Sequence, residues 1–137
     1  MSIKTKELVN TWGGWLGEES WDYFSTITYR YDISARRNEN IMLGIEERLK
    51  NKTPSHKLFW IMEYTSNNYQ THNHLLIKGD GARDEIDLYL KEKGLVNPKC
   101  VKHEEYDSSL GANYYVSKHI HSNKVRYGLS YSKDYVQ

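Results

Sequence analysis

Two histidines one residue apart on a short apolar run are the residues of this sequence best suited to chemistry. His72 and His74 follow a polar stretch and lead into the aliphatic residues Leu75 to Ile77, a pattern that predicts a β-strand. Side chains alternate along a strand, so both imidazoles project from one face, with their Cα atoms roughly 6.5–7 Å apart. At that separation two imidazoles can converge on one metal ion or one phosphate group.

A carboxylate is predicted to join the two histidines. Glu63 lies near the end of a preceding predicted strand, and a hairpin between the two strands would bring it opposite His72 and His74. Two imidazoles and one carboxylate with open coordination positions suit Mg²⁺, Mn²⁺ or Zn²⁺, and the imidazoles favour Mn²⁺ or later metals over Mg²⁺. Such an ion would act as a Lewis acid for phosphoryl transfer.

The histidine pair has two other interpretations. Both side chains could be hydrogen-bonded polar residues on an exposed strand face. A structural zinc site is the second alternative, and it requires a fourth protein ligand. The candidates for that ligand are His56, His103, His119 and His121.

A tyrosine on a predicted helix is the candidate nucleophile. Tyr114 and Tyr115 precede Lys118 by four and three residues, so the ammonium group can share a helical face with either phenol. A phenol with a pKa of about 10 is a poor nucleophile at neutral pH, and a neighbouring ammonium group stabilises the phenolate. Ordinary packing also produces this spacing, and helical phase alone does not choose between the two tyrosines.

Hydrophobic periodicity predicts the elements that position these residues. The predicted strands cover residues 21–29, 57–64, 70–77, 99–106 and 124–130, and the predicted helices cover 35–51, 80 or 81 to 94, and 108 or 109 through 118. Ser34 is expected to cap the first helix, whose Ile41, Ile45 and Leu49 recur at helical spacing. The order β-α-β-β-α-β-α-β predicts an α+β, ferredoxin-like or RRM-like fold, with helices packed on a largely antiparallel five-stranded sheet.

Composition indicates one globular domain spanning residues 1–137, with residues 1–20 as an N-terminal extension of uncertain role. Hydrophobic residues make up 38% of the chain and charged residues 27%. The single cysteine, Cys100, excludes an intrachain disulfide and a thiolate cluster. Without a signal-peptide pattern or a membrane-length apolar segment, a cytoplasmic, intracellular location is expected.

Charge is unevenly distributed although the formal net charge is only +1. No acidic residue occurs between Asp107 and Asp134, whereas basic residues recur there. A locally basic segment is the expected footprint of a phosphate backbone. The residues predicted to hold DNA in this segment are Lys124, Arg126 and Lys133.

Taken together, the motifs resemble those of HUH endonucleases, specifically the single-tyrosine replication initiators of rolling-circle plasmids and viruses. The resemblance rests on the order Phe24 to Tyr29, then Glu63 with His72 to His74, then Tyr115 to Lys118, and covers about residues 22–130. One departure is Asn73, because the middle residue of the histidine motif is usually apolar. This departure concerns the packing of the strand's other face more than the ligands.

The resemblance implies a role for each matching residue. Glu63, His72 and His74 would bind Mn²⁺ or Mg²⁺. Tyr115 would be the nucleophile, with Tyr114 as the alternative and Lys118 as its helper. Thr26 and Thr28 of the first motif are predicted to contact DNA.

The implied activity is a sequence-specific nick in single-stranded or hairpin origin DNA. The tyrosine would become linked to the 5′ phosphate, the released 3′ hydroxyl would prime synthesis, and a later transfer would rejoin the strand without ATP. A separate helicase and polymerase are the expected partners of a monomer or homodimer, with no membrane involved. The alternatives are an insertion-sequence transposase of the same superfamily, a non-catalytic single-stranded nucleic-acid-binding module, and a small metallohydrolase that activates water.

Overall fold

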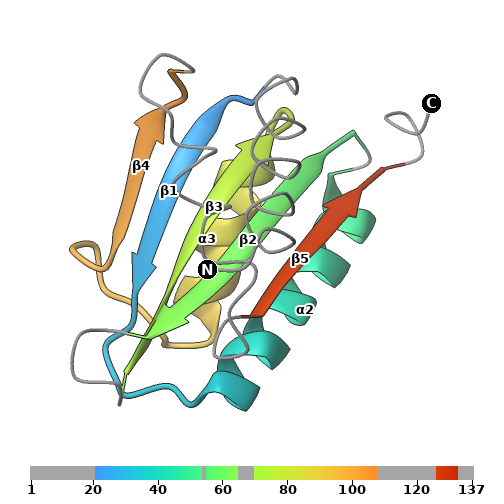
Figure 1. Ribbon diagram of the computed structural model, residues 1–137. Coiled ribbons are helices and arrows are strands. Elements are labelled where there is room, and N and C mark those ends of the chain that lie inside the picture. The colour runs from blue at the N-terminus through green and yellow to red at the C-terminus, as the bar shows by residue number, and fades with distance from the viewer. Residues whose placement is uncertain (1–20, 54, 65–69, 108–125, 133–137) are drawn as a thin grey trace, which may run out of the picture.

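The computed structural model describes residues 21–53, 55–64, 70–107 and 126–132, which form one antiparallel sheet with two helices (Figure 1). In chain order the elements are β1 (Tyr23–Thr28), α2 (Ala35–Lys52), β2 (Lys57–Tyr64), β3 (Thr71–Lys78), α3 (Ala82–Glu92), β4 (Val101–Glu105) and β5 (Arg126–Tyr131). The strand order is β4-β1-β3-β2-β5, and every adjacent pair is antiparallel. The predicted α+β fold with a five-stranded antiparallel sheet is confirmed. The predicted third helix lies outside the described residues.

Local sequence signals explain where the helices begin and end. The Ser34 hydroxyl accepts a hydrogen bond from the backbone N–H of Arg37 at 3.2 Å, which confirms it as the cap of α2. After α3 ends at Glu92, Gly94 adopts the left-handed conformation with φ of 66°, which glycine takes without steric cost. The predicted end of this helix at glycine is therefore confirmed.

The sheet has a different apolar core on each of its two faces. Both α2 and α3 pack on one face, where the predicted helical stripe is buried together with every second residue of β2 (Figure 1). The residues of that face include Ile41, Ile45, Leu49, Leu58, Trp60 and Met62. The opposite face carries a smaller buried cluster formed by Trp21, Phe59, Ile61 and Leu76. Because the central strands β2 and β3 are buried on both faces of the sheet, a polar side chain on either strand is held in a fixed position.

Asn73 is fully buried on the helix-side face of β3, where a polar network satisfies its amide group. Its Oδ1 accepts from Asn38 Nδ2 at 2.9 Å and from the Tyr29 hydroxyl at 2.6 Å, and its Nδ2 donates to Asn38 Oδ1 at 2.9 Å. Asn38 Nδ2 also donates to Thr71 Oγ1 at 3.0 Å. Burial raises the pKa of Tyr29, so its hydroxyl is protonated and donates at neutral pH. The network ties β3 to α2 directly behind the histidine motif.

A double-mutant cycle tests this network. We expect Asn38→Ala and Asn73→Ala each to lower the free energy of unfolding by about 1–3 kcal/mol, because each leaves a buried amide without its partner. The double variant should cost less than the sum of the two, with a coupling of about 0.5–3 kcal/mol measured by urea denaturation. Asn40→Ala, at an exposed position of the same helix, is the matched control. Additive costs would show that the two amides do not depend on each other.

Candidate metal centre

The register of two neighbouring strands brings Glu63, His72 and His74 together on one face of the sheet. β2 pairs with β3 so that Glu63 is directly opposite His72, and Ile61 is directly opposite His74. Alternation along each strand then places all three polar side chains on the face away from the helices. The predicted grouping is confirmed.

The donor atoms of these three residues are close enough to hold one metal ion. One ligand atom from each lies within 4.8 Å of the other two, and His74 Nε2 is 3.1 Å from Glu63 Oε1. Donors bound about 2.1 Å from one ion lie roughly 3.0 Å apart when they are adjacent in an octahedron. Within the part of the chain that the structure describes, this is the one group of three such ligands gathered this closely.

The chemistry of the donors also fits a divalent ion. Two imidazole nitrogens and one carboxylate oxygen suit Mn²⁺, Zn²⁺ and other first-row ions better than the all-oxygen sites that Mg²⁺ prefers. Three protein ligands leave positions for water or a substrate oxygen. The side chains of Glu63 and His74 are only 12% and 9% exposed, so the apolar surroundings strengthen electrostatic interactions at the site.

Two residues of β1 hold the His74 ring in place. Thr26 is opposite His74 in the register, and its hydroxyl lies 3.3 Å from His74 Nδ1. Phe24 stacks on the same ring at a centroid distance of 5.7 Å and an interplanar angle of 7°. With Nδ1 bonded to Thr26, Nε2 is the nitrogen that faces Glu63. Bonding of the second ring nitrogen is what orients the histidines of metal sites.

Neither described candidate for a fourth zinc ligand belongs to this group. His56 Nδ1 is bonded to the Thr53 carbonyl at 2.9 Å, and its Nε2 to the Ser130 hydroxyl at 2.9 Å. His103 is opposite Ser25 in the register, which places it on the helix-side face of the sheet. His119 and His121 lie outside the described residues. Among the described residues, the group therefore has three candidate ligands and no histidine as a fourth. This favours a site with open coordination positions over the four-ligand zinc site.

His103 takes part in a separate hydrogen-bonded chain with Ser25 and Asp87. Its Nδ1 lies 2.5 Å from Ser25 Oγ, and its Nε2 lies 2.8 Å from Asp87 Oδ1. In serine hydrolases the nitrogens have the reverse order, and the serine hydroxyl is open to substrate. Ser25 is 1% exposed, so its hydroxyl is inaccessible. The chain connects β1 and β4 to α3 and has a structural role.

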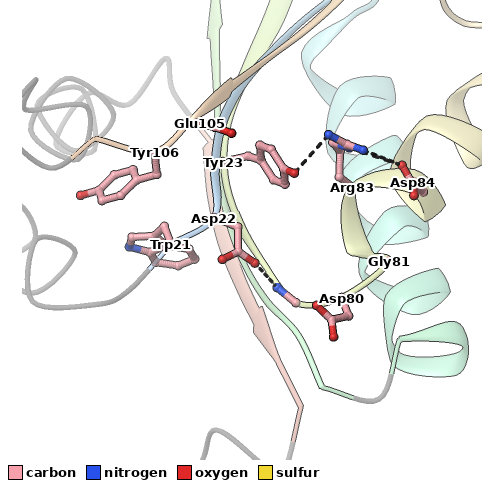
Figure 2. Close-up of a pocket in the computed structure, with 10 residues that line it drawn as sticks. Trp21, Asp22, Tyr23, Asp80, Gly81, Arg83, Asp84, Glu105 and Tyr106 are labelled. Carbon is pink, nitrogen blue, oxygen red and sulfur yellow. Dashed lines mark hydrogen bonds and ion pairs between the residues drawn. The ribbon is translucent and has the colours of Figure 1, made fainter.

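A hollow of about 480 Å³ is lined by residues at the start of β1 and in the turn after β3 (Figure 2). The register of β1 with β3 puts the histidines toward the opposite end of these strands. The hollow is rich in carboxylates, and two of them have hydrogen-bond donors: Asp22 accepts from the Gly79 backbone N–H at 2.9 Å, and Asp84 accepts from Arg83 at 3.3 Å. Arg83 also donates to the Tyr23 hydroxyl at 3.1 Å. None of the described groups here forms a second cluster of three ligands.

The remaining predicted site residues have different locations. Thr28 is opposite His72 in the register and shares its face of the sheet. Arg126 lies on the helix-side face, where its guanidinium pairs with Glu39 of α2 at 2.5 Å. DNA contact by these two residues stays a prediction. The other predicted residues fall outside the described part of the chain; they are Tyr114, Tyr115, Lys118, Lys124 and Lys133.

Comparison with known proteins identifies no family for this chain. A scan against protein-family models gives no match, and a search of curated proteins gives none either. Among the described residues, neither helix is both long enough and apolar enough to cross a membrane. The interpretation of the site therefore depends on its geometry and on the chemistry of its ligands.

Removing any one ligand should abolish tight metal binding. We expect His72→Ala, His74→Ala and Glu63→Gln each to weaken Mn²⁺ binding by at least about 100-fold, because losing a ligand costs more than losing its hydrogen-bond partner. Isothermal titration calorimetry measures the affinity. Glu104→Gln is the matched control, since Glu104 is an exposed carboxylate on the same face of the sheet. Wild-type affinity in all three ligand variants would contradict the assignment.

Thr26 should influence metal binding without being a ligand. Thr26→Val keeps the side-chain shape and removes the hydroxyl that faces His74, so we expect Mn²⁺ affinity to fall by about 10-fold or more. Thr28→Val, on the same strand and face, serves as the control. Thermal unfolding without metal separates a loss of stability from a loss of affinity. Equal Mn²⁺ affinities in the two variants would show that the Thr26 hydroxyl does not position the ring.

Proposed function

We propose that this protein cuts and rejoins single-stranded DNA through a covalent link between a tyrosine and the 5′ phosphate of the cut strand. The observation that carries the proposal is the gathering of Glu63, His72 and His74 on one face of an antiparallel sheet, with donor atoms within 4.8 Å. The resemblance of this ligand set, of the strand motif before it and of the tyrosine motif after it to HUH endonucleases supports the same activity.

The ligand set supports phosphoryl transfer in preference to a purely structural role. A divalent ion bound by these three residues would supply a Lewis acid that polarises a phosphate oxygen. Thr26 and Phe24 hold the His74 ring, so that its Nε2 is directed toward Glu63. Ligands fixed in this way require little rearrangement when substrate arrives, which is the condition for electrostatic catalysis.

The nucleophile in this proposal is Tyr115, with Lys118 stabilising its phenolate. The phenol oxygen forms a bond to the scissile phosphorus while the bond from phosphorus to the 3′ oxygen breaks. The proton lost by the phenol ends on the departing oxygen as a 3′ hydroxyl. Attack of a 3′ hydroxyl on the phosphotyrosine reverses the step and rejoins a strand. One phosphodiester is exchanged for another, so no nucleoside triphosphate is consumed.

Such a reaction is suited to starting rolling-circle replication. The free 3′ hydroxyl can prime a polymerase, and a separate helicase would unwind the template. Recognition of a particular origin sequence, in a single strand or a hairpin, would select the phosphate to be cut.

Formation of a covalent protein–DNA adduct tests the proposal. Purified full-length protein is incubated with a random single-stranded oligonucleotide pool and Mn²⁺, and adducts are resolved on a denaturing gel and sequenced. We expect adducts that require metal and that Tyr115→Phe abolishes, because phenylalanine has no hydroxyl to attack phosphorus. Tyr114→Phe is the matched control and should retain them. The reverse pattern would make Tyr114 the nucleophile and leave the chemistry unchanged.

The products separate this activity from its alternatives. A strand cut with a free 5′ phosphate and no adduct would indicate that water attacks, as in a metallohydrolase. Metal-independent binding with no cleavage of any sequence in the pool would indicate a non-catalytic binding module. Either result would overturn the proposal.

A further inference from the structure

Strand β5 carries two exposed tyrosines on the same face of the sheet as the metal-ligand group. Tyr127 and Tyr131 are 41% and 47% exposed. Their partners across the β2–β5 ladder are Ile61 and Lys57, which lie on the face away from the helices. Covering a large aromatic side chain with another apolar surface is energetically favourable. Two of them exposed on one strand therefore indicate a surface that binds something flat and apolar.

The register places these tyrosines in line with the ligands. Tyr127 is opposite Ile61, which is opposite His74, so Tyr127 lies two strands across from a metal ligand in the same row. Two strand spacings correspond to about 10 Å between the Cα atoms. Tyr131 lies four residues further along β5, roughly 13 Å from Tyr127. The pair therefore forms a track that begins beside the metal-ligand group and leads away from it along the edge of the described sheet.

The surroundings of the track are apolar near Tyr127 and basic near Tyr131. The Phe59 and Tyr127 rings lie 6.5 Å apart, which supports the Tyr127 ring from one side. Lys57 is opposite Tyr131, and Lys78 is opposite Lys57, so two ammonium groups project from neighbouring strands on this face. Aromatic rings for bases beside ammonium groups for phosphates are the two components of single-strand nucleic-acid surfaces.

We propose that Tyr127 and Tyr131 stack on unpaired bases and that Lys57 and Lys78 contact the adjoining phosphates, so that β5 guides the strand flanking the cut to the metal centre. A duplex is excluded as the ligand because its bases are stacked on one another about 3.4 Å apart and offer no free face to a tyrosine. This inference rests on the proposed function for the identity of the strand. It assigns new contacts to residues that the sequence motifs do not include.

Binding measured separately from cleavage tests the track. Fluorescence anisotropy with a labelled single-stranded oligonucleotide selected by the wild-type protein gives the affinity without added metal. We expect Tyr127→Ala and Tyr131→Ala each to weaken binding by at least about 5-fold, and the phenylalanine variants at both positions to retain it, because stacking needs the ring and not the hydroxyl. Lys57→Gln should not increase the loss of affinity caused by either alanine substitution. It should reduce the salt dependence of binding.

Matched controls come from the opposite face. Leu43→Ala and Leu88→Ala remove side chains of similar exposure, 48% and 43%, from α2 and α3 and should bind as wild type does. Circular dichroism confirms that each variant is folded. A double-stranded form of the same oligonucleotide should bind more weakly than the single strand.

The outcomes distinguish this inference from the proposed function. If only the alanine variants lose DNA binding, and neither the wild type nor any variant cleaves DNA with metal added, the track is supported and the nuclease activity is overturned. Cleavage and binding unchanged in both alanine variants would overturn the track and leave the nuclease standing. A wild-type chain that binds no oligonucleotide, or a dimer that the alanine variants dissociate without loss of DNA affinity, would also overturn the track.

Discussion

The antiparallel register between β2 and β3 is the constraint on which the candidate site depends. It places Glu63 directly opposite His72 and next to His74, and the period of two along each strand turns all three side chains to one face. A shift of one residue in this register would move Glu63 out of line with its partners. Apolar side chains buried on both faces of these strands specify the register, such as Phe59 on the face that carries the ligands and Trp60 on the helix side.

The histidine strand has a distinct role on each of its faces. On one face His72 and His74 meet Glu63, and on the other Asn73 bonds to Asn38 of α2. The amide pair uses its hydrogen-bonding groups fully, so a polar residue at the centre of the strand is buried without an unsatisfied group. Because the amide network is directional, it fixes the position of β3 against α2 more specifically than an apolar contact would. The strand that carries His72 and His74 is thus fixed in position by hydrogen bonds on its opposite face.

Much of the fold could be predicted from the sequence because its signals are local. Alternation around His72, the cap at Ser34 and the glycine at position 94 each report on a few neighbouring residues, and the elements they mark are observed. The grouping of Glu63 with the histidines was predictable because a single hairpin connects them. Thr26 as the partner of His74 was not, because it depends on pairing between β1 and β3, which are 48 residues apart at this contact. The partners of Asn73 were missed for the same reason, since 35 residues separate it from Asn38.

We propose that Glu63, His72 and His74 bind one divalent cation on the face of the sheet opposite the helices. A crystal of the full-length protein grown with Mn²⁺, with diffraction recorded at the manganese absorption edge, tests it most directly. We expect one anomalous peak within about 2.3 Å of both imidazoles and the carboxylate. A fully occupied manganese ion bound elsewhere, with Glu63 and His74 still in direct contact with each other, would contradict it.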